Sequence, residues 1–600
     1  MKSFLKMLLA SILGVVAGMG CLLFILVPIL IASVAALFAP NNQPLTSIES
    51  NTVLKVDLST ISEVVEENPF QRFLGGESKT PVSLSNALRA IRKAKNNPNV
   101  VGIYLSVEHM SAGMASVDEV REAIDDFKQS GKFVVAYADT YGQKDYYLST
   151  VADHVLLNPV GEVALVGIAS TNLMFKGLLD NLGVKSEVFK VGTYKAAVEP
   201  FVLQHISEAN REQIESYIGG LWGSMTHAIA QARGISPEVL DSMVSQGIAF
   251  DTSERMREVG LVDSLIYRSD VGEFVADLID PELSQKDLRM VTLSDMLGVP
   301  SNHEPSGRDI IAVLTLEGEI MPEEYTQFGP STQVIGYSYV DKIKELAEDD
   351  AVKAVVLRIN SPGGSAFISE QIYEAVRQLS AQKPVVTSMG DVVASGGYYI
   401  ASASNYIVSG RNTLTGSIGI FGLLQNATEL ARRAGVTLDV VKTNKYADYG
   451  SMSMLLQPIG PEQRAQIQRQ VERGYDIFLS RVAQGRGMTD EQVDAVGQGR
   501  VWLGARALEL GLVDELGGLQ TAIAKAAELA NLADYSIDHG TTVQNVLEQL
   551  LEQSTSTGEF VAGLRYLFLS PTEQQLLRLL ERHSTPFDLK ARLPYEINPY

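Results

Sequence analysis

The chain of 600 residues carries one sequence pattern twice, and this repeat constrains its fold more than any other feature. Four short stretches of the first half return in the same order in the second half, three of them 252 residues later and the fourth 251 residues later. The paired stretches are residues 101–106 with 353–358, 146–148 with 398–400, 167–168 with 419–420, and 260–263 with 511–514. Ordered matches at a nearly constant offset predict two homologous domains in tandem.

The two copies differ at two positions that bear on chemistry. Ser395, in the second copy, stands opposite Gln143 of the first copy. Lys195, in the first copy, stands opposite Ala447 of the second copy. Each copy therefore keeps one half of a possible reactive pair, a serine hydroxyl and a lysine amine.

Length and composition favour a folded protein of more than one domain. A chain of 600 residues exceeds what one hydrophobic core holds, and 46% apolar with 20% charged residues is typical of globular proteins. The net charge of −22 argues against a nucleic-acid partner, since such proteins need a basic face to displace phosphate counterions. Cys21 is the single cysteine and the seven histidines lack metal-site spacing, so we expect no disulfide framework, no metal and no cofactor.

The N-terminal segment predicts a membrane anchor. No charged residue occurs between Lys6 and Glu49, and residues 7–39 are almost continuously apolar, longer than the roughly 20 residues that span a bilayer. The apolar region of a cleavable signal peptide has about 7 to 15 residues, so an uncleaved anchor is the better interpretation, although residues 33–35 leave cleavage open. With lysines only on its short amino-terminal side, that end is expected in the cytoplasm and the bulk of the chain on the other side.

Within each copy, short apolar runs alternate with amphipathic segments. The expected strands are residues 99–105, 133–137, 154–157, 310–316, 352–359, 384–389 and 406–409. The expected helices are residues 84–96, 116–129, 339–348 and 368–381. This alternation predicts an α/β fold with mostly parallel sheets covered by helices.

The same pattern divides the chain into five segments. Residues 1–45 are the predicted cytoplasmic end and anchor, and residues 46–298 are the first repeat, which supplies Lys195. Residues 299–308, rich in Pro, Ser, Gly and Asn, form the predicted linker. Residues 309–535 are the second repeat, which supplies Ser395, and residues 536–600 are a C-terminal extension with an expected helix at 576–582.

Ser395 lies between an expected strand and an expected helix, and two glycines follow it. Such a turn presents the serine at a helix N-terminus, where free N–H groups and a partial positive charge gather. The sequence alone leaves open that Ser395 only caps this helix.

A glycine-rich loop, Asn-Ser-Pro-Gly-Gly-Ser, occupies residues 360–365 of the second copy and has no counterpart in residues 108–113 of the first. Glycines let the backbone approach a ligand closely. We expect N–H groups of Gly363 or Gly364, together with that of Gly396, to form an oxyanion hole, in which one donor contributes about 3 kcal/mol. An ordinary turn is the alternative interpretation of this loop.

A serine nucleophile needs a base, because its hydroxyl is weakly nucleophilic at neutral pH. No histidine lies in a recognisable triad context, and no Gly-x-Ser-x-Gly motif surrounds Ser395. Lys195, in a mainly uncharged stretch, becomes a base if burial lowers its pKa, although by itself it is typical of a surface lysine. Ser417, which stands opposite Leu165, either orients that lysine or serves a turn.

These residues resemble the signal peptide peptidase A family in its long form, also called protease IV. The resemblance covers nearly the whole chain and is carried by the N-terminal segment, both repeats and the motifs at residues 192–201, 360–364, 394–398 and 415–422. It implies tandem domains related to ClpP and crotonase, and a serine endopeptidase with Ser395 as nucleophile, Lys195 as general base and Ser417 near the lysine. It also implies a homotetramer, anchored in the inner membrane of a bacterial cell with its bulk in the periplasm, that degrades cleaved signal peptides.

Two other functions stay open on the residues alone. A crotonase-like acyl-CoA enzyme could use the same oxyanion geometry without needing Ser395. A membrane-anchored scaffold could carry a vestigial site. The Pro-Gly-Gly loop at residues 362–364 and the Gly-Ser-Ile-Gly loop at residues 416–419, both in the copy that has the serine, favour a working peptidase.

Overall fold

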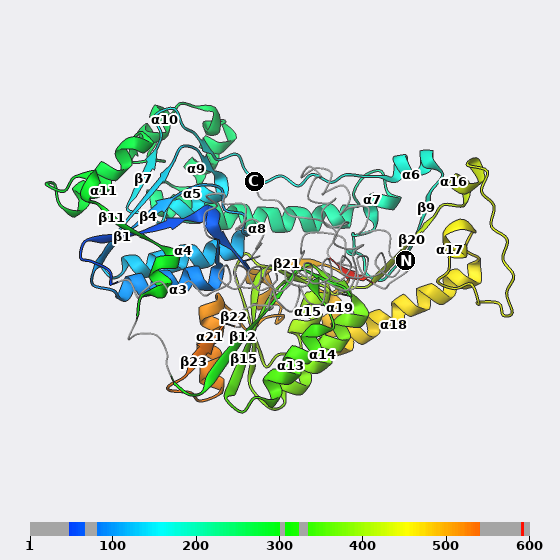
Figure 1. Ribbon diagram of the computed structural model, residues 1–600. Coiled ribbons are helices and arrows are strands. Elements are labelled where there is room, and N and C mark those ends of the chain that lie inside the picture. Colours follow the sequence, from blue (N-terminus) through cyan, green and yellow to red (C-terminus); the bar gives the residue numbers. More distant parts are fainter. Residues whose placement is uncertain (1–46, 66–80, 301–306, 323–333, 540–589, 593–600) are drawn as a thin grey trace, which may run out of the picture. The chain divides into compact units, whose positions relative to one another are not determined.

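The computed structural model describes residues 47–65, 81–300, 307–322, 334–539 and 590–592 (Figure 1). The predicted anchor at residues 7–39 and the predicted helix at residues 576–582 lie outside these ranges. Among the described residues, every helix is too short or too polar to cross a membrane.

Both repeats belong to one compact unit, residues 49–297 and 301–600. Residues 1–48 and 298–300 are grouped in a second, small unit. The large unit contains the three main sheets and the residues expected to be reactive. The boundaries of the five segments remain predictions.

The first repeat is built on a parallel six-stranded sheet with the order β10-β7-β5-β4-β1-β11. These strands are β1 (Thr52–Asp57), β4 (Val100–Ser106), β5 (Phe133–Ala138), β7 (His154–Leu157), β10 (Ser264–Leu265) and β11 (Arg289–Thr292). The helices of this repeat are α3 (Leu84–Asn96), α4 (Met114–Lys128), α5 (Gln143–Ser149), α6 (Lys176–Leu182), α7 (Glu199–Val202), α8 (Glu208–Arg233), α9 (Pro237–Ser245), α10 (Ser253–Glu258), α11 (Val271–Ile279) and α12 (Leu293–Gly298).

The second repeat is built on an eight-stranded sheet in which only the β19–β21 pair is antiparallel. Its strands are β12 (Ile310–Glu317), β15 (Val352–Ser361), β17 (Val385–Ala394), β18 (Tyr406–Ser409), β19 (Leu414–Gly416), β21 (Val501–Leu503), β22 (Glu515–Leu516) and β23 (Ser536–Asp538). Its helices are α13 (Ser338–Glu348), α14 (Ala366–Ser380), α15 (Gly396–Ala401), α16 (Thr428–Arg433), α17 (Ser453–Leu456), α18 (Pro461–Arg486), α19 (Asp490–Val496), α20 (Gly504–Glu509) and α21 (Leu519–Leu529). The predicted α/β alternation with mostly parallel sheets is confirmed in both repeats.

The second sheet is buried on both faces. Successive residues of a strand point to opposite faces, so Ile311 packs in the cluster that contains α21 while Ala312 packs with α13 and α14. Figure 1 shows α13 and α14 on one side of β12 and β15 and α21 on the other. This burial on two faces explains why the strands are continuous apolar runs in the sequence.

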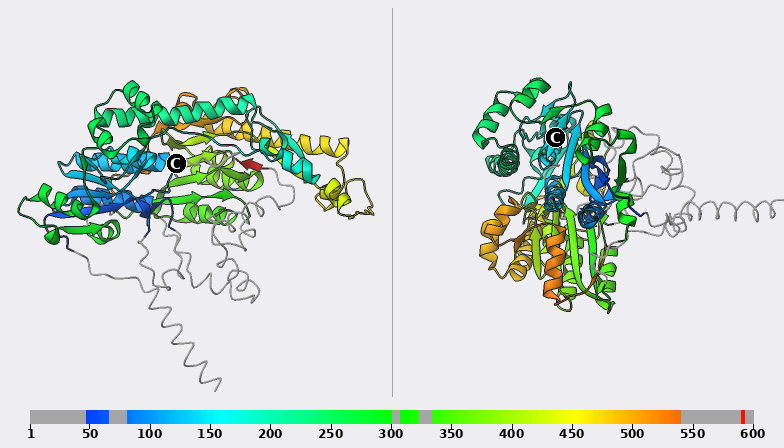
Figure 2. Two further views of the ribbon diagram at one scale, coloured as in Figure 1. Left: turned by 90° about the horizontal axis from the view of Figure 1, so that it is seen from above. Right: turned by 90° about the vertical axis from the view of Figure 1, so that its left-hand side faces the viewer.

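The repeated motifs are explained by contacts that recur in both copies. The hydroxyl of Tyr146 donates to the carbonyl of Leu261 at 2.6 Å, and that of Tyr398 donates to the carbonyl of Leu512 at 2.7 Å. At the ends of the two long helices α8 and α18, which can be followed by colour in Figure 2, an arginine binds the aspartate of each Gly-Leu-Val-Asp motif. The two ion pairs are Arg233 with Asp263 and Arg486 with Asp514.

A third, mixed sheet joins the two repeats, and the sequence did not predict it. Its order is β14-β13-β16-β24-β20-β9. The strands are β9 (Lys185–Lys190), β13 (Glu319–Ile320), β14 (Val334–Ile335), β16 (Gly363–Ser365), β20 (Phe421–Asn426) and β24 (Lys590–Arg592). Strand β9 of the first repeat pairs antiparallel with β20 of the second, so the chain just before Lys195 is bound to the other copy.

Asp391 of β17 caps helix α4 across the repeat boundary. The N-cap of α4 is Gly113, which has no side chain to bind the free N–H groups of the first turn. The Asp391 carboxylate accepts hydrogen bonds from the N–H of Gly113 and from the N–H and hydroxyl of Ser116, each at 2.9 Å. A Cβ at position 113 would come within 2.4 Å of the Asp391 carboxyl carbon, so this contact requires glycine.

Candidate active site

The structure brings Lys195 and Ser395 together. The Nζ atom of Lys195 lies 2.8 Å from the Oγ atom of Ser395, and both side chains are 0% exposed. Lys195 lies between β9 and α7, and Ser395 lies at the turn from β17 into α15. Two residues 200 positions apart in the sequence are therefore in direct contact.

Ser417 completes the surroundings of the lysine amine. The Nζ atom of Lys195 lies 3.0 Å from the Oγ of Ser417 and donates to the Ser417 carbonyl at 3.1 Å. A neutral amine has two N–H groups and one lone pair, and a carbonyl oxygen only accepts. With both N–H groups directed to Ser417, the lone pair is left for the hydroxyl hydrogen of Ser395, which is the arrangement that proton transfer requires.

Burial lowers the pKa of Lys195 well below the 10.5 of a free lysine, because removal from water disfavours the ammonium form. A neutral amine is able to accept a proton and an ammonium is not. Burial therefore favours the neutral, proton-accepting form of Lys195.

Ser395 does not serve as a capping residue for the helix that follows it. It stands at the N-cap position of α15, but its side chain makes no capping hydrogen bond. Its backbone has φ 56° and ψ −115°, a conformation that side-chain-bearing residues rarely adopt. The Ser395 N–H donates to the carbonyl of Gly416 at 2.8 Å and its carbonyl accepts from the N–H of Tyr399 at 2.8 Å, so both ends of the strained residue are fixed.

Backbone strain is concentrated at this site. Among the described residues, five that are not glycine have a positive φ, namely Asn51, Ser395, Ser417, Gln498 and Asn531. Three of the five, at positions 395, 417 and 498, lie around the Lys195 amine or its backbone. Strained conformations persist where the surrounding structure enforces them, typically at functional sites.

The three glycines expected to bind an oxyanion lie beside the serine. Gly396 is the first residue of α15, where N–H groups lack partners within the helix, and Gly363 and Gly364 form most of β16. The loop packs against the start of the helix, since a Cβ at Gly397 would lie 2.9 Å from the carbonyl oxygen of Ser361. The N–H of Gly363 donates to the Ser361 hydroxyl at 3.2 Å, and a Cβ at Gly364 would lie 2.0 Å from the carbonyl oxygen of Ile320.

Sequence reasoning missed a turn at residues 498–500 that contacts both the Lys195 segment and the Ser417 segment. A signal for it was present, because Gln498-Gly499 repeats Gln246-Gly247 at the offset of 252 residues. The turn acts mainly through backbone N–H and carbonyl groups, to which the sequence gives no direct guide.

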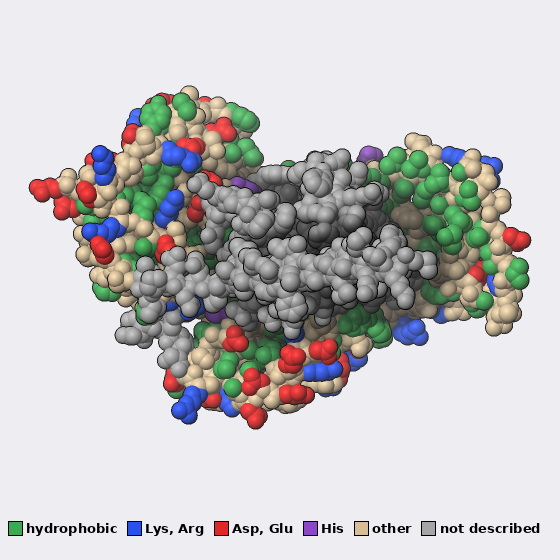
Figure 3. Space-filling view, in the orientation of Figure 1, with side chains coloured by type: hydrophobic (Ala, Val, Ile, Leu, Met, Phe, Trp, Pro, Cys, Tyr) green, Lys and Arg blue, Asp and Glu red, His purple; other side chains and the backbone are tan. Residues whose placement is uncertain are grey.

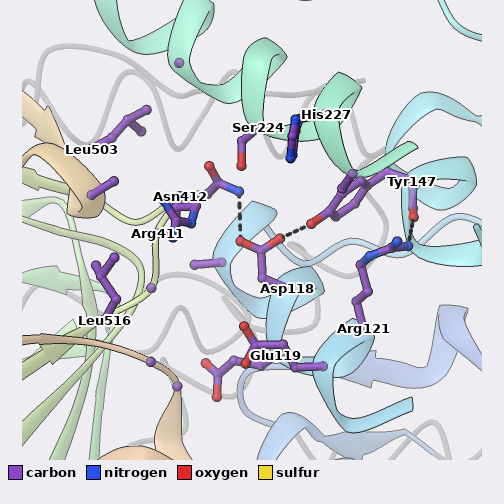
Figure 4. A pocket seen from close by; sticks show the side chains of 18 of the residues that line it. Asp118, Glu119, Arg121, Tyr147, Ser224, His227, Arg411, Asn412, Leu503 and Leu516 are labelled. Atoms are coloured by element: carbon purple, nitrogen blue, oxygen red, sulfur yellow. Dashed lines mark hydrogen bonds between the residues drawn. The ribbon is translucent and has the colours of Figure 1, made fainter. Parts of the chain in front are cut away.

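A polar cavity of about 1770 Å³ lies elsewhere, lined by α4, α8 and residues 410–412 (Figure 4). There the Asp118 carboxylate accepts hydrogen bonds from the Tyr147 hydroxyl at 2.7 Å and from the Asn412 amide at 2.8 Å, and burial raises its pKa to about 7. Neither Lys195 nor Ser395 lines this cavity, so its size does not make it the place of the serine chemistry.

Known proteins resemble this chain over most of its length. The protein-family model of peptidase family S49 matches residues 126–280 and 377–533, one segment in each repeat, and that of Clp protease matches residues 320–413. Protease 4 of Salmonella typhi is 37% identical over 79% of this chain and 76% of its own length, and Protease 4 of Haemophilus influenzae is 32% identical over 86% and 85%. The chloroplastic Serine protease SPPA of Arabidopsis thaliana is 29% identical over 84% of this chain and 72% of its own length. The chain belongs to peptidase family S49 and is a serine peptidase built from two copies of the family's domain.

Proposed function

We propose that this serine peptidase is a membrane-anchored endopeptidase that degrades cleaved signal peptides, with Ser395 as nucleophile and Lys195 as general base. The observation that carries the proposal is the buried 2.8 Å contact between the Lys195 amine and the Ser395 hydroxyl. The lowered pKa of Lys195 supports it, because the base must be neutral before it accepts the serine proton.

The reaction is acyl transfer to the serine followed by hydrolysis. Lys195 takes the hydroxyl proton as Ser395 Oγ bonds to the scissile carbonyl carbon, and the carbonyl oxygen becomes an oxyanion held by the N–H groups of Gly396 and of Gly363 or Gly364. The Lys195 ammonium then gives the proton to the leaving amine as the peptide bond breaks. A water, deprotonated by Lys195, then attacks the acyl carbon, and the Lys195 ammonium returns that proton to Ser395 Oγ as the ester bond breaks and the acid product leaves.

Ser417 positions the base in this scheme. Its hydroxyl and carbonyl occupy the two N–H groups of the neutral amine, at 3.0 and 3.1 Å. The lone pair is thereby turned toward Ser395. Its role parallels that of the third residue in other serine-peptidase triads, which orients the base without exchanging the proton.

The substrate is proposed to bind as an extended strand along β16. This strand accepts an antiparallel neighbour, since residues 590–592 of the same chain pair with it and Ala591 stands opposite Gly364. Main-chain hydrogen bonds along such an edge give affinity without demanding a particular sequence. The motifs shared with the signal peptide peptidase A family support cleaved signal peptides, whose apolar centres suit apolar side-chain pockets.

The proposed location is the inner membrane of a bacterial cell, with a single pass and the bulk of the chain in the periplasm. The apolar residues 7–39, with Lys2 and Lys6 before them, support this placement and a contact with membrane lipid. The Clp protease match to residues 320–413 supports a fold related to ClpP and crotonase for the repeats.

A homotetramer is the proposed assembly. Exposed apolar side chains gather in Figure 3 at the end that carries α6, α16 and α17. On these helices and in the chain next to them, six apolar side chains are between 40% and 69% exposed, namely Leu173, Leu178, Leu182, Leu430, Val436 and Met452. A contiguous apolar surface of this kind is typical of a protein interface and supports self-association.

The dyad is tested with purified full-length Ser395→Ala and Lys195→Ala proteins. Each should lose cleavage of a panel of signal peptides followed by mass spectrometry, and labelling of the wild-type protein by a serine-reactive phosphonate should map to Ser395. Ser380→Ala and Lys176→Ala, which alter a half-buried serine and a half-buried lysine outside the site, are the matched controls and should retain activity. Full activity in either dyad variant rejects the mechanism.

A further inference from the structure

The turn at residues 498–500 connects the segment that carries Lys195 with the segment that carries Ser417. Three backbone hydrogen bonds make the connection, from the N–H of Tyr194 to the carbonyl of Gln498 at 2.9 Å, from Gly499 to Ile418 at 2.7 Å, and from Ser417 to Arg500 at 2.7 Å. Lys195 belongs to the first repeat, whereas the turn and Ser417 belong to the second. The turn is therefore the segment of the second repeat that binds the backbone next to Lys195 of the first repeat.

Glycines bring these backbones into contact. Gly499 has φ +78°, and a Cβ there would lie 2.6 Å from the backbone nitrogen of Lys195 and 2.7 Å from its Cβ. Gly192 has φ +104°, and a Cβ there would lie 2.5 Å from the carbonyl of Gln498. Contacts this close fix where the Lys195 side chain begins.

The side chain of Arg500 locks the turn to the residue before Lys195. Its guanidinium carbon lies 4.6 Å from the ring centre of Tyr194 and 4.4 Å from that of Trp502, so the cation interacts with two aromatic rings. It also donates to the Tyr194 hydroxyl at 3.1 Å and forms an ion pair of 2.8 Å with Glu212 of α8. The Tyr194 hydroxyl donates to the same carboxylate at 3.0 Å, which closes the network.

Comparison with the first repeat shows which part of this arrangement occurs in both copies and which part occurs in the second copy alone. Gly247, the counterpart of Gly499, also has a left-handed backbone with φ +82°. The residue after it is Ile248, where the second repeat has Arg500. The turn is thus common to both copies, and the arginine occurs in the copy that contacts the Lys195 segment.

We propose that Arg500 is a positioning residue that holds the Lys195 amine against Ser395 and Ser417 by clamping Tyr194 across the repeat boundary. The proposal rests on the proposed dyad. Arg500 acts through Tyr194 and the 498–500 backbone and contacts neither reacting atom. Its loss should leave the peptide-binding edge of β16 unchanged, while the amine gains freedom and contact with water.

The test compares full-length Arg500→Gln with Arg500→Lys and with Arg506→Gln, which removes an exposed arginine paired with Glu509. For an apolar peptide, Arg500→Gln should lower kcat by about tenfold to a hundredfold, since small misplacements of a catalytic group have effects of that size. KM should stay within about twofold, because ground-state binding energy is kept. Arg500→Lys retains a cation over the two rings and should recover part of the rate, whereas Arg506→Gln should match the wild type.

The second readout is the rate at which a phosphonate labels Ser395 as the pH is varied. In Arg500→Gln the pH midpoint of this labelling rate should move to higher pH. A better hydrated Lys195 amine is protonated more easily, so it needs a more alkaline solution to become neutral. The proposal is overturned if Arg500→Gln has the kcat of the wild type and the same pH midpoint of labelling. It is also overturned if the variant has a higher KM while its pH midpoint of labelling is unchanged. If Arg500→Gln does not fold, Tyr194→Leu replaces it, because it removes the ring and the hydroxyl that Arg500 contacts, and a wild-type midpoint there has the same meaning.

The two proposals fail in different ways. Activity in Lys195→Ala rejects the dyad itself. An inactive Lys195→Ala beside an unaltered Arg500→Gln rejects only the positioning role.

Discussion

Arg358 of β15 and Glu119 of α4 form a buried ion pair across the repeat boundary, with 2.7 Å between Nη1 and Oε1. Glu63 binds the same guanidinium, its Oε1 lying 2.6 Å from Nε and its Oε2 3.0 Å from Nη2. Desolvation would lower the pKa of Arg358, but the two carboxylates outweigh it and raise that pKa. The first repeat has Ser106 at the position of Arg358, so this contact, like the Lys195–Ser395 pair, is found where the copies diverge.

Replacing Arg358 by methionine should destabilise the whole protein. The change leaves Glu63 and Glu119 buried without a cation, and breaking a buried pair in this way costs about 3–5 kcal/mol of the free energy of unfolding. Denaturant unfolding followed by circular dichroism measures the loss. Arg432→Met, which removes an exposed pair with Glu429, is the control and should unfold as the wild type does. Equal unfolding curves for the two variants would mean that the buried pair does not hold the repeats together.

Activity should rise with pH through the lowered pKa of Lys195 and then level off. Burial disfavours the ammonium form, so the amine becomes neutral at a pH below the 10.5 of a free lysine. The pH profile of kcat/KM reports the groups of the free enzyme and is the measurement to make. A rise with its midpoint at 10.5 or above would indicate a hydrated lysine, which contradicts the buried site.

Lys195 should also give the stability of the protein a distinct pH dependence. Between its lowered pKa in the folded state and 10.5 in the unfolded state, the unfolded chain binds a proton that the folded chain does not, so stability rises with pH in that window. The Tm of the wild type should therefore increase relative to that of Lys195→Met as the pH is raised through the window, and the difference should become constant above it. A constant Tm difference for Lys195→Met across the window would show that the folded-state pKa is not lowered.

Local sequence pattern predicted the helices and strands whose buried residues recur at a regular spacing. Strands 154–157 and 406–409 and helix 84–96 were placed to the residue, because apolar periodicity and neighbouring caps define them. Strand β9 was missed, since Lys185–Lys190 is only half buried and pairs with β20, which lies in the other repeat. Its stability depends on a partner that the local sequence does not reveal.

The contact between Lys195 and Ser395 was anticipated from the repeat, because Gln143 and Ala447 marked where each copy lacks one of the two residues. Sequence reasoning could not predict the contacts between the repeats that bring these two residues together. Asp391 binds N–H groups of α4, and the 498–500 turn binds backbone groups of two other segments. Such contacts depend on the position of the main chain, which every residue type shares.

The C-terminal strand should compete with peptide substrates. Residues 590–592 run antiparallel along β16, with Arg592 opposite Gly363 and Lys590 opposite Ser365, so they occupy the edge proposed above for an extended substrate. A protein that ends before Lys590 should have a lower KM for peptides and an unchanged kcat, because the edge is free while the dyad is intact. A protein that ends after Arg592 keeps β24 and should behave as the wild type. Steady-state kinetics of the two truncations decide the matter, and an equal KM in both would place the substrate on another edge.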